Sequence, residues 1–236
     1  MTRVATWNCN MAFRNKKDQI IEHNPDILVV QECENPASKG DWSEFTDWRW
    51  IGDNEHKGLG VFTRNGLRIE AVQPRVDDCE YFLSVETSEL DVVGVWAMND
   101  EQNPAQRYIG QVYSFLKSHP EEVDKNTAVI GDFNWNIIWD ESPNSSLCGD
   151  FSDVLGILNS HGLRSVYHEL TDTTFGNEDT ATFYMHKKAE RPYHIDYAFL
   201  PEPLLRSVGE LEIGEFDEWT EASDHMPLMV EIENTR

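Results

Sequence analysis

Short apolar runs that end in carboxylate, amide or imidazole side chains are the feature that most constrains the fold of this sequence. The polar residues at or beside these runs are Asn8, Glu32, Asp132, Asn134, Asp196, Asp224 and His225. Loops at the ends of core strands are where α/β folds place their functional sites. A carboxylate near a core is costly unless a partner or a metal compensates its charge. The pattern therefore predicts one polar site assembled from several strand ends.

The pattern of apolar residues along the chain predicts many strands and fewer helices. Strands are expected at 3–8, 27–32, 47–51, 58–63, 67–73, 80–87, 90–96, 127–134, 163–168, 181–186, 193–200 and 227–232, and helices at 14–23, 104–117 and 148–160. Hairpins interleaved with helices indicate two sheets packed together with helices outside, an α/β class. Since neither a repeat nor a linker interrupts the chain, residues 1–236 are expected to form a single domain.

The charge balance is strongly acidic, with 19 Lys and Arg against 43 Asp and Glu and a net charge of −24. Such a surface repels nucleic acid at long range. Either the protein works in high salt, where screening shortens that repulsion, or its substrate is small enough to meet only the active site. The first is favoured because the acids are scattered along the whole chain.

The remaining composition argues against metal-cysteine, membrane and secreted classes. The four cysteines form no C-x-x-C pair, which disfavours zinc and redox sites. No apolar stretch approaches the roughly 20 residues of a membrane span. The N-terminal residues MTRVATWNCN lack the pattern of a signal peptide. We expect a cytoplasmic protein with no membrane partner.

The inventory of polar side chains indicates phosphate chemistry with a hard cation. Carboxylate oxygens suit magnesium or manganese better than zinc. Asparagine can hold phosphate oxygens without adding charge, and a histidine beside an aspartate can stabilise a transferring phosphoryl group. The sequence contains no P-loop, G-x-S-x-G or H-E-x-x-H motif that would indicate another chemistry.

Five ordered strings resemble the signature of the endonuclease/exonuclease/phosphatase superfamily. They are WN at 7–8, QE at 31–32, GDFN at 131–134, IDYAF at 195–199 and SDHMPL at 223–228. The resemblance runs from residue 4 to about residue 232, and the branch containing exonuclease III and the abasic-site endonucleases is the nearest. It implies a four-layered α/β sandwich, in which two mixed sheets face each other and helices lie outside.

The resemblance also implies roles for the residues at the first strand ends. Asn8 would contact the phosphate or position the metal, and Glu32 would be the principal ligand of Mg²⁺ or Mn²⁺. Asp132 would align or deprotonate the attacking water, and Asn134 would hold the phosphate.

The later strings complete the implied site. His225 would contact the phosphoryl oxygens in the transition state, and Asp196 would orient its ring. Asp224 would assist at the metal or at the site of protonation.

One departure from the family pattern and one parallel with it concern substrate binding. Where many relatives carry a histidine or a tyrosine on a central strand, this chain has Trp96, with Asn99 three residues on. An indole donates a hydrogen bond but exchanges no proton at working pH. Phe183, Tyr184 and Tyr193 lie near the Asp196 strand, where related strings line the pocket for a flipped sugar. We expect them to stack on a base or fill an abasic gap.

The sequence thus predicts a divalent-metal-dependent phosphodiester hydrolase, a nuclease acting on DNA in the manner of repair enzymes. The expected partner is nucleic acid, without a protein partner, and the expected state is a monomer. A phosphatase or phosphodiesterase of a small phosphorylated molecule or lipid head group on the same fold is the alternative. A non-catalytic scaffold would lack at least one central ligand, whereas all are present.

Overall fold

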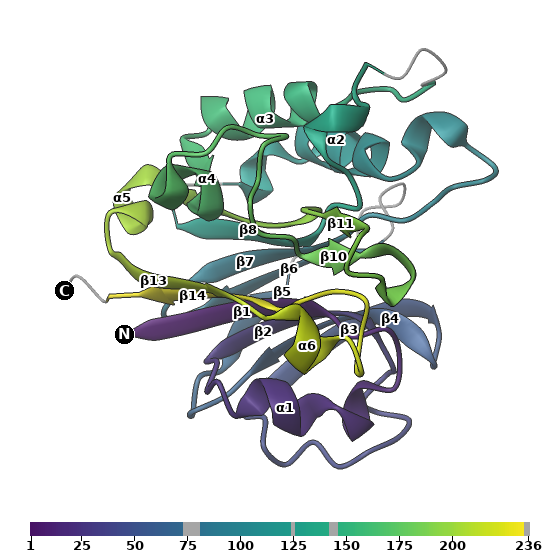
Figure 1. The fold of residues 1–236 in the computed structure, drawn as a ribbon. Coiled ribbons are helices and arrows are strands. Elements are labelled where there is room, and N and C mark those ends of the chain that lie inside the picture. The colour runs from purple at the N-terminus through teal and green to yellow at the C-terminus, as the bar shows by residue number, and fades with distance from the viewer. Residues whose placement is uncertain (73–80, 124–125, 142–145, 234–236) are drawn as a thin grey trace.

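The computed structural model describes residues 1–72, 81–123, 126–141 and 146–233. Within this part of the chain, two six-stranded sheets face each other and helices cover their outer surfaces (Figure 1). This is the α/β sandwich that the sequence predicts. In Figure 1, α2, α3 and α4 lie above the sheets, whereas α1 and α6 lie below them.

The first sheet has the order β13-β14-β1-β2-β4-β3. Its strands are β1 (Thr2–Asn8), β2 (Ile27–Cys33), β3 (Asp47–Asn54), β4 (Lys57–Thr63), β13 (Val208–Ile213) and β14 (Leu228–Ile232). The neighbours β1 and β2 are parallel, whereas β1 and β14 are antiparallel. The carboxyl ends of the two parallel strands, at Asn8 and Gln31, therefore meet at the same edge.

The second sheet has the order β5-β6-β7-β8-β12-β9. Its strands are β5 (Ile69–Val72), β6 (Phe82–Thr87), β7 (Asp91–Trp96), β8 (Thr127–Asp132), β9 (Leu163–Ser165) and β12 (Asp196–Pro201). Here β7 and β8 are parallel, and β12 runs antiparallel to β8 with Asp196 opposite Asp132. A short ribbon, β10 (Phe183–Tyr184) paired with β11 (Pro192–Tyr193), lies beside the sheets.

Short helices complete the described fold. The α-helices are α1 (Lys17–Ile21), α2 (Ile109–Ser118), α3 (Phe151–Ser160), α4 (Val166–Thr171), α5 (Glu202–Leu205) and α6 (Phe216–Trp219). Single 3₁₀ turns are η1 (Phe13–Asn15), η2 (Pro104–Gln106), η3 (Pro120–Glu122), η4 (Ile137–Trp139) and η5 (Met185–Lys187). No helix in the described ranges is long and apolar enough to cross a membrane.

Alternating side chains on each central strand fill three apolar layers. In β2, Val29 packs between the sheets, whereas Leu28 and Val30 pack against the outer helices of the first sheet. In β7, Val92 likewise faces the other sheet and Val93 faces the helical layer. A strand with both faces covered has a nearly continuous run of apolar residues in its sequence. Each buried side chain of this size stabilises the fold by about 1.5–3 kcal/mol. The sandwich thus holds the strand ends rigidly.

Several predicted elements are wrong or shorter than expected. The strand expected at 163–168 ends at Ser165, and α4 begins at Val166, where Ser165 Oγ bonds His168 Nδ1 at 2.7 Å across the first turn. The helix expected at 104–117 is broken by extended backbone at Arg107. The break occurs where the Tyr108 amide bonds the Met98 carbonyl at 2.6 Å.

The other differences concern the ends of elements and a few elements that the sequence did not predict. The helix expected at 14–23 is the turn η1 followed by α1, and the strand expected at 181–186 is reduced to β10. The elements β13, α5 and α6 were not expected. The predicted strands at 67–73 and 80–87 correspond to β5 and β6, but residues 73 and 80 lie outside the described residues.

Candidate active site

Glu32 lies at a bulge in β2, where the register against β4 shifts between Gln31 and Cys33. Its φ of 61° is in the left-handed region, which non-glycine residues adopt rarely. A bulge inserts one unpaired residue and redirects its side chain. The Glu32 carboxylate is 19% exposed and its Oε1 lies 3.1 Å from Lys57 Nζ. The bulge therefore presents a partly exposed carboxylate at the edge of the first sheet.

Gly131 allows β8 to approach β7 closely, just before the polar segment at its end. Its φ is 152°, and a Cβ on this residue would lie 2.0 Å from the carbonyl oxygen of Val95. No side chain fits at that distance, so this position requires glycine. The close pairing places Asp132 beside Trp96 in the parallel register.

Asp132 is fully buried and accepts two hydrogen bonds. Asn8 Nδ2 donates to its Oδ2 at 3.0 Å, and the Asn134 backbone N–H donates to its Oδ1 at 2.8 Å. The second bond closes a turn in which Asn134 has a left-handed φ of 51°. Asn134 Nδ2 in turn donates to the Ala97 carbonyl at 3.2 Å. Asn8 lies on the first sheet and Asp132 on the second, so their bond joins the two sheets at the site.

His225 and Asp196 form a buried pair. His225 Nδ1 lies 3.0 Å from Asp196 Oδ2 and 3.2 Å from Oδ1. The other ring nitrogen, Nε2, lies 4.0 Å from Asp132 Oδ2, which is beyond hydrogen-bond distance. The amide N–H groups of Ile195 and Asp196 donate to Thr182 Oγ1 at 3.0 and 2.9 Å, so Thr182 fixes the start of β12.

Ser223 ties the histidine to the first sheet. Its hydroxyl donates to the Asn8 carbonyl at 2.6 Å and accepts from the His225 amide at 3.1 Å. Trp7 Nε1 donates to the His225 carbonyl at 3.0 Å. The loop before β14 is therefore fixed against β1, and the ring of His225 cannot move away without breaking buried hydrogen bonds.

Burial and charge shift the acid–base properties of the two central groups. Burial raises the pKa of Asp132 to about 7, with His225 opposing the shift and Asp196 adding to it. For His225, burial acts to lower the pKa, but the carboxylates of Asp196 and Asp132 outweigh it and raise the pKa to about 10. Near neutral pH the site therefore combines a cationic imidazole with a carboxyl group that can gain or lose a proton.

The structure brings Asn8, Asp132, Asp196 and His225 together, with Asn134 bonded to Asp132. Asp224 lies at the same edge, where its Oδ1 accepts from Asn10 Nδ2 at 3.2 Å.

Trp96 and Asn99, two of the predicted substrate contacts, lie in different surroundings. The Trp96 side chain is 1% exposed, and its ring packs 4.7 Å from that of Tyr81. Lys57 Nζ lies 5.1 Å from the centroid of the Trp96 ring. Asn99 is exposed beyond the end of β7. Trp96 thus supports the site from within the core, and its contact with a substrate stays a prediction.

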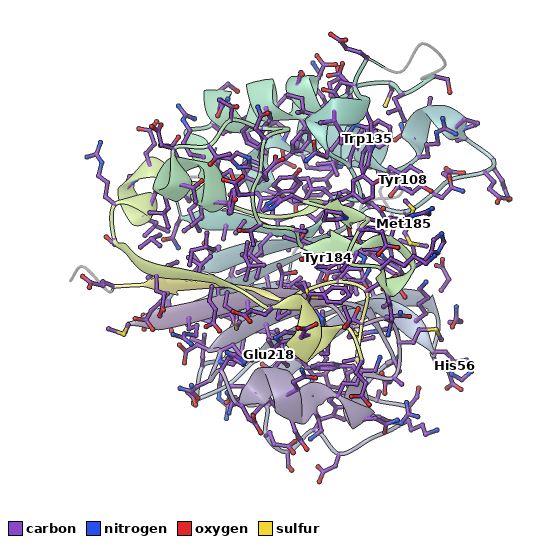
Figure 2. All side chains as sticks on the ribbon, in the orientation of Figure 1. His56, Tyr108, Trp135, Tyr184, Met185 and Glu218 are labelled. Atoms are coloured by element: carbon purple, nitrogen blue, oxygen red, sulfur yellow. The ribbon has the colours of Figure 1, made fainter. Side chains whose placement is uncertain are left out.

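The aromatic residues predicted near the site border the buried cluster of Asp132, Asp196 and His225. The Phe183 ring lies 4.6 Å from that of His225, and the Tyr184 amide donates to the Asp224 carbonyl at 2.8 Å. Tyr193 pairs with Phe183 across the β10–β11 ribbon. All three side chains are half-buried. Figure 2 shows Tyr184 and Met185 where this ribbon reaches the surface.

The residues that directly follow the polar end of β8 were not predicted to belong to the site. Trp135 lies two residues before the turn η4, and Trp139 is the last residue of that turn. The start of η4 is capped because the Asn136 side chain accepts from the Ile138 amide at 3.1 Å. The Trp135 and Trp139 rings are 5.6 Å apart, and Trp139 lies 5.2 Å from Tyr193. The signal in the sequence was the string NWNIIW immediately after GDF.

The oxygen donors at this edge suit a hard divalent cation. Glu32 and Asp224 offer carboxylates, and Asn8 offers an amide oxygen, which are the ligand types that Mg²⁺ and Mn²⁺ prefer. Glu32 is more exposed than the central pair and forms an ion pair with Lys57. By contrast, Asp196 is committed to His225. The residues present therefore fit a metal held on the Glu32 side of the cluster.

The sequence profile of the Endonuclease/Exonuclease/phosphatase family matches residues 5–225. This chain belongs to that family. A search of curated proteins found no match.

Solved structures confirm the family fold at low sequence identity. A 3′ phosphatase from Neisseria bound to a product DNA hairpin is 17% identical and has a TM-score of 0.73, covering 99% of this chain and 100% of that chain. An AP endonuclease from Archaeoglobus fulgidus is 18% identical with the same TM-score and the same coverage. One from Leishmania major is 14% identical, with a TM-score of 0.73 and coverage of 99% and 88%. At these identities, the likeness shows the fold.

Proposed function

We propose that this member of the family is a divalent-metal-dependent phosphodiester hydrolase that acts on DNA. The observation that carries the proposal is the buried cluster in which Asp132 faces His225 Nε2 at 4.0 Å while Asp196 holds the other ring nitrogen. Two carboxylates and a histidine are costly to bury together unless each is paired or hydrogen-bonded, and here Nε2 of His225 lies beyond hydrogen-bond distance of Asp132, which leaves it available to a ligand. Their ligand atoms lie within 4.8 Å of one another.

In this proposal Asp132 receives the proton of the attacking water. Its raised pKa, about 7, makes the carboxylate a stronger base than an exposed aspartate. Hydrogen bonds from Asn8 and from the Asn134 amide fix the direction of its lone pairs. A water bound to Asp132 is thereby aligned for attack on phosphorus.

His225 stabilises the charge that develops on the phosphoryl oxygens. Its raised pKa keeps the ring protonated near neutral pH, and Nε2–H is directed toward the space beside Asp132 rather than bonded to it. Asp196 acts as a positioning residue because it accepts from Nδ1. Donors placed before the reaction are among the largest contributions to catalysis.

A divalent cation, Mg²⁺ or Mn²⁺, held by Glu32 with Asn8 or Asp224 would offset the charge of the phosphate. Lys57 already balances Glu32, so binding of the cation requires this ion pair to loosen. The half-buried Phe183, Tyr184 and Tyr193 supply apolar surface beside the reacting phosphate. Two of the similar structures are AP endonucleases, and a third is a 3′ phosphatase bound to a product DNA hairpin. These likenesses support DNA as the substrate and a role in repair.

The test is cleavage of three labelled substrates: a duplex with one abasic analogue, the intact duplex, and a single strand. Each is incubated with Mg²⁺ or with EDTA, from low to molar salt. We expect incision that requires Mg²⁺ and is lost in the Glu32→Gln and His225→Ala variants. Full Mg²⁺-dependent activity in both variants would refute the assignment of roles.

A second candidate, a phosphatase of a small phosphorylated molecule, is favoured by the net charge of −24. It predicts hydrolysis of small phosphoesters with no cutting of any nucleic acid at any salt. The same series with a small phosphomonoester added separates the two functions.

A further inference from the structure

A continuous row of aromatic rings leads away from His225 along the edge that carries the site. We define this aromatic track as Phe183, Tyr193, Trp139, Trp135 and Tyr108. From His225, the successive ring centroids are 4.6, 6.4, 5.2, 5.6 and 6.3 Å apart. Each residue of the track is half-buried, so none of the five is enclosed in the core. In Figure 2, Tyr108 and Trp135 lie on the same side of the molecule as Tyr184.

Hydrogen bonds hold the far end of the track rigidly. The Trp135 indole donates to Asp140 Oδ1 at 2.9 Å. The Tyr108 amide donates to the Met98 carbonyl at 2.6 Å, and Tyr108 has a φ of 51°, in the left-handed region. Backbone held in this conformation persists only where the surroundings impose it. The Trp135 ring and the backbone of Tyr108 are therefore held in place before any ligand arrives, which reduces the entropy cost of binding at this end of the track.

A pocket of about 330 Å³ opens beside the track, between Tyr193, Tyr184 and the turn η4. At its margin, Ile138 is 54% exposed, which is unusual for a large apolar side chain. His194 also lines the pocket and is 3% exposed. Its Nδ1 bonds the Thr180 carbonyl at 2.8 Å, while its Nε2 has no hydrogen-bond partner among the described residues.

The charge of the protein limits which ligand fits this surface. With a net charge of −24, the chain cannot rely on the many cationic contacts that hold a duplex backbone. Stacking of bases on aromatic rings needs no such contacts, and unpaired bases expose the faces that it requires. The track also ends at the ring of His225, so a strand lying on it is continuous with the reacting phosphate.

We propose that the aromatic track binds a single-stranded segment of the nucleic acid substrate by base stacking, with one base seated in the pocket beside Tyr193. This inference rests on the proposed function, because it extends the substrate site beyond the reacting phosphate. Binding then depends on aromatic surface more than on ionic contacts, which is compatible with the acidity of the chain.

The test measures binding of fluorescein-labelled oligodeoxyadenylate, and of its duplex with oligothymidylate, to the full chain in EDTA from low to molar salt. We expect Trp139→Ala and Trp135→Ala to weaken single-strand binding about tenfold each, with Trp139→Phe close to wild type. The control Tyr113→Ala removes a half-buried ring of α2 outside the track and should have no effect. Melting curves establish that each variant is folded.

The track is refuted if folded Trp135→Ala and Trp139→Ala variants bind the single strand as wild type does. It is also refuted if wild type binds the duplex more tightly, or if affinity falls with salt as steeply as for a surface with many phosphate contacts. Cleavage is scored separately in Mg²⁺. If wild type cleaves DNA and the tryptophan variants bind and cleave as it does, only the proposal of the aromatic track is refuted. If binding depends on the tryptophans but no nucleic acid is cleaved, only the proposed function is refuted.

Discussion

Two buried histidine–carboxylate pairs in this protein differ in the hydrogen bonds of the second ring nitrogen of each histidine. His225 lies 3.0 Å from Asp196, and His168 lies 3.1 Å from Glu178, and all four side chains are buried. In the second pair the remaining groups are satisfied, because His168 Nδ1 bonds Ser165 Oγ at 2.7 Å and Glu178 Oε1 also accepts from the Gly176 amide. In the first pair, Nε2 of His225 lies beyond hydrogen-bond distance of Asp132.

The difference shows that pairing alone does not mark a catalytic histidine. A closed network of satisfied bonds contributes stability and leaves no group to act on a ligand. A histidine with one nitrogen held and the other available is oriented to transfer a proton or to donate to a substrate. We therefore assign chemistry to His225 and a structural role to His168.

The largest effect is expected for His225→Gln. We expect kcat to fall about 10³-fold, because a neutral amide cannot supply the positive charge at the phosphoryl oxygens. His168→Gln, the matched change in the closed pair, should leave kcat near wild type. Steady-state kinetics on the cleaved substrate, with melting curves for both variants, makes the comparison. Equal losses of kcat in the two variants would abolish the distinction.

His168→Ala should act on stability instead. The change leaves the buried Glu178 without its histidine partner, so we expect the free energy of unfolding to fall by about 3 kcal/mol while kcat of the folded enzyme is kept. Urea denaturation measures the first quantity and initial rates at low temperature measure the second. A loss of stability under 1 kcal/mol, on the order of an exposed ion pair, would mean that this pair is not a closed structural unit.

Asp196→Asn should lower kcat about 10²-fold, since the ring of His225 loses the acceptor that orients it. The pKa of His225 should also fall, because the Asp196 carboxylate contributes to raising it. Activity at alkaline pH should therefore be lost at a lower pH than in wild type. The pH profile of kcat provides the measurement, and an unchanged alkaline limb would show that Asp196 does not act through His225.

The smallest effect concerns the pH dependence of stability. Burial favours the neutral form of Glu178, but hydrogen bonds from His168 and the Gly176 amide outweigh it and lower its pKa to about 2. Because the pKa of Glu178 is lower in the folded protein than its value of 4.5 in the unfolded chain, the ionised carboxylate stabilises the fold above pH 4.5. This contribution is lost as the pH falls toward 2. We expect about 1–2 kcal/mol after allowance for solvent screening. Urea midpoints of wild type and Glu178→Gln across this interval test it: a difference that does not shrink toward low pH would contradict the assignment.

The sequence predicted the sandwich and the position of the site because central strands are continuous apolar runs followed by polar residues. That signal located Asn8, Asp132 and Glu32 at strand ends. It did not reveal the bulge at Glu32 or its left-handed backbone, since both depend on pairing with β4. Whether the predicted residues have the roles given to them stays a prediction for kinetics to decide.

Elements at the margin of the sheets were harder to predict. The edge strand β13 has a mixed burial pattern, and its glutamates at 210 and 212 disrupt the apolar signal of a strand. In α4, Val166 and Tyr167 favour a strand locally, but such preferences depend on tertiary context, and both residues are buried within the helix. Trp135 and Trp139 were overlooked because their importance lies in ring positions that only the fold defines.

The bond from Asn8 to Asp132 joins the first sheet to the second, and His225 joins the cluster from the far end of the chain. Contacts so distant in sequence form late, because the loops between them must first be closed. During synthesis, a growing chain therefore cannot assemble this cluster until residue 225 and the strand after it have left the ribosome. In refolding, recovery of turnover should therefore lag behind the recovery of secondary structure.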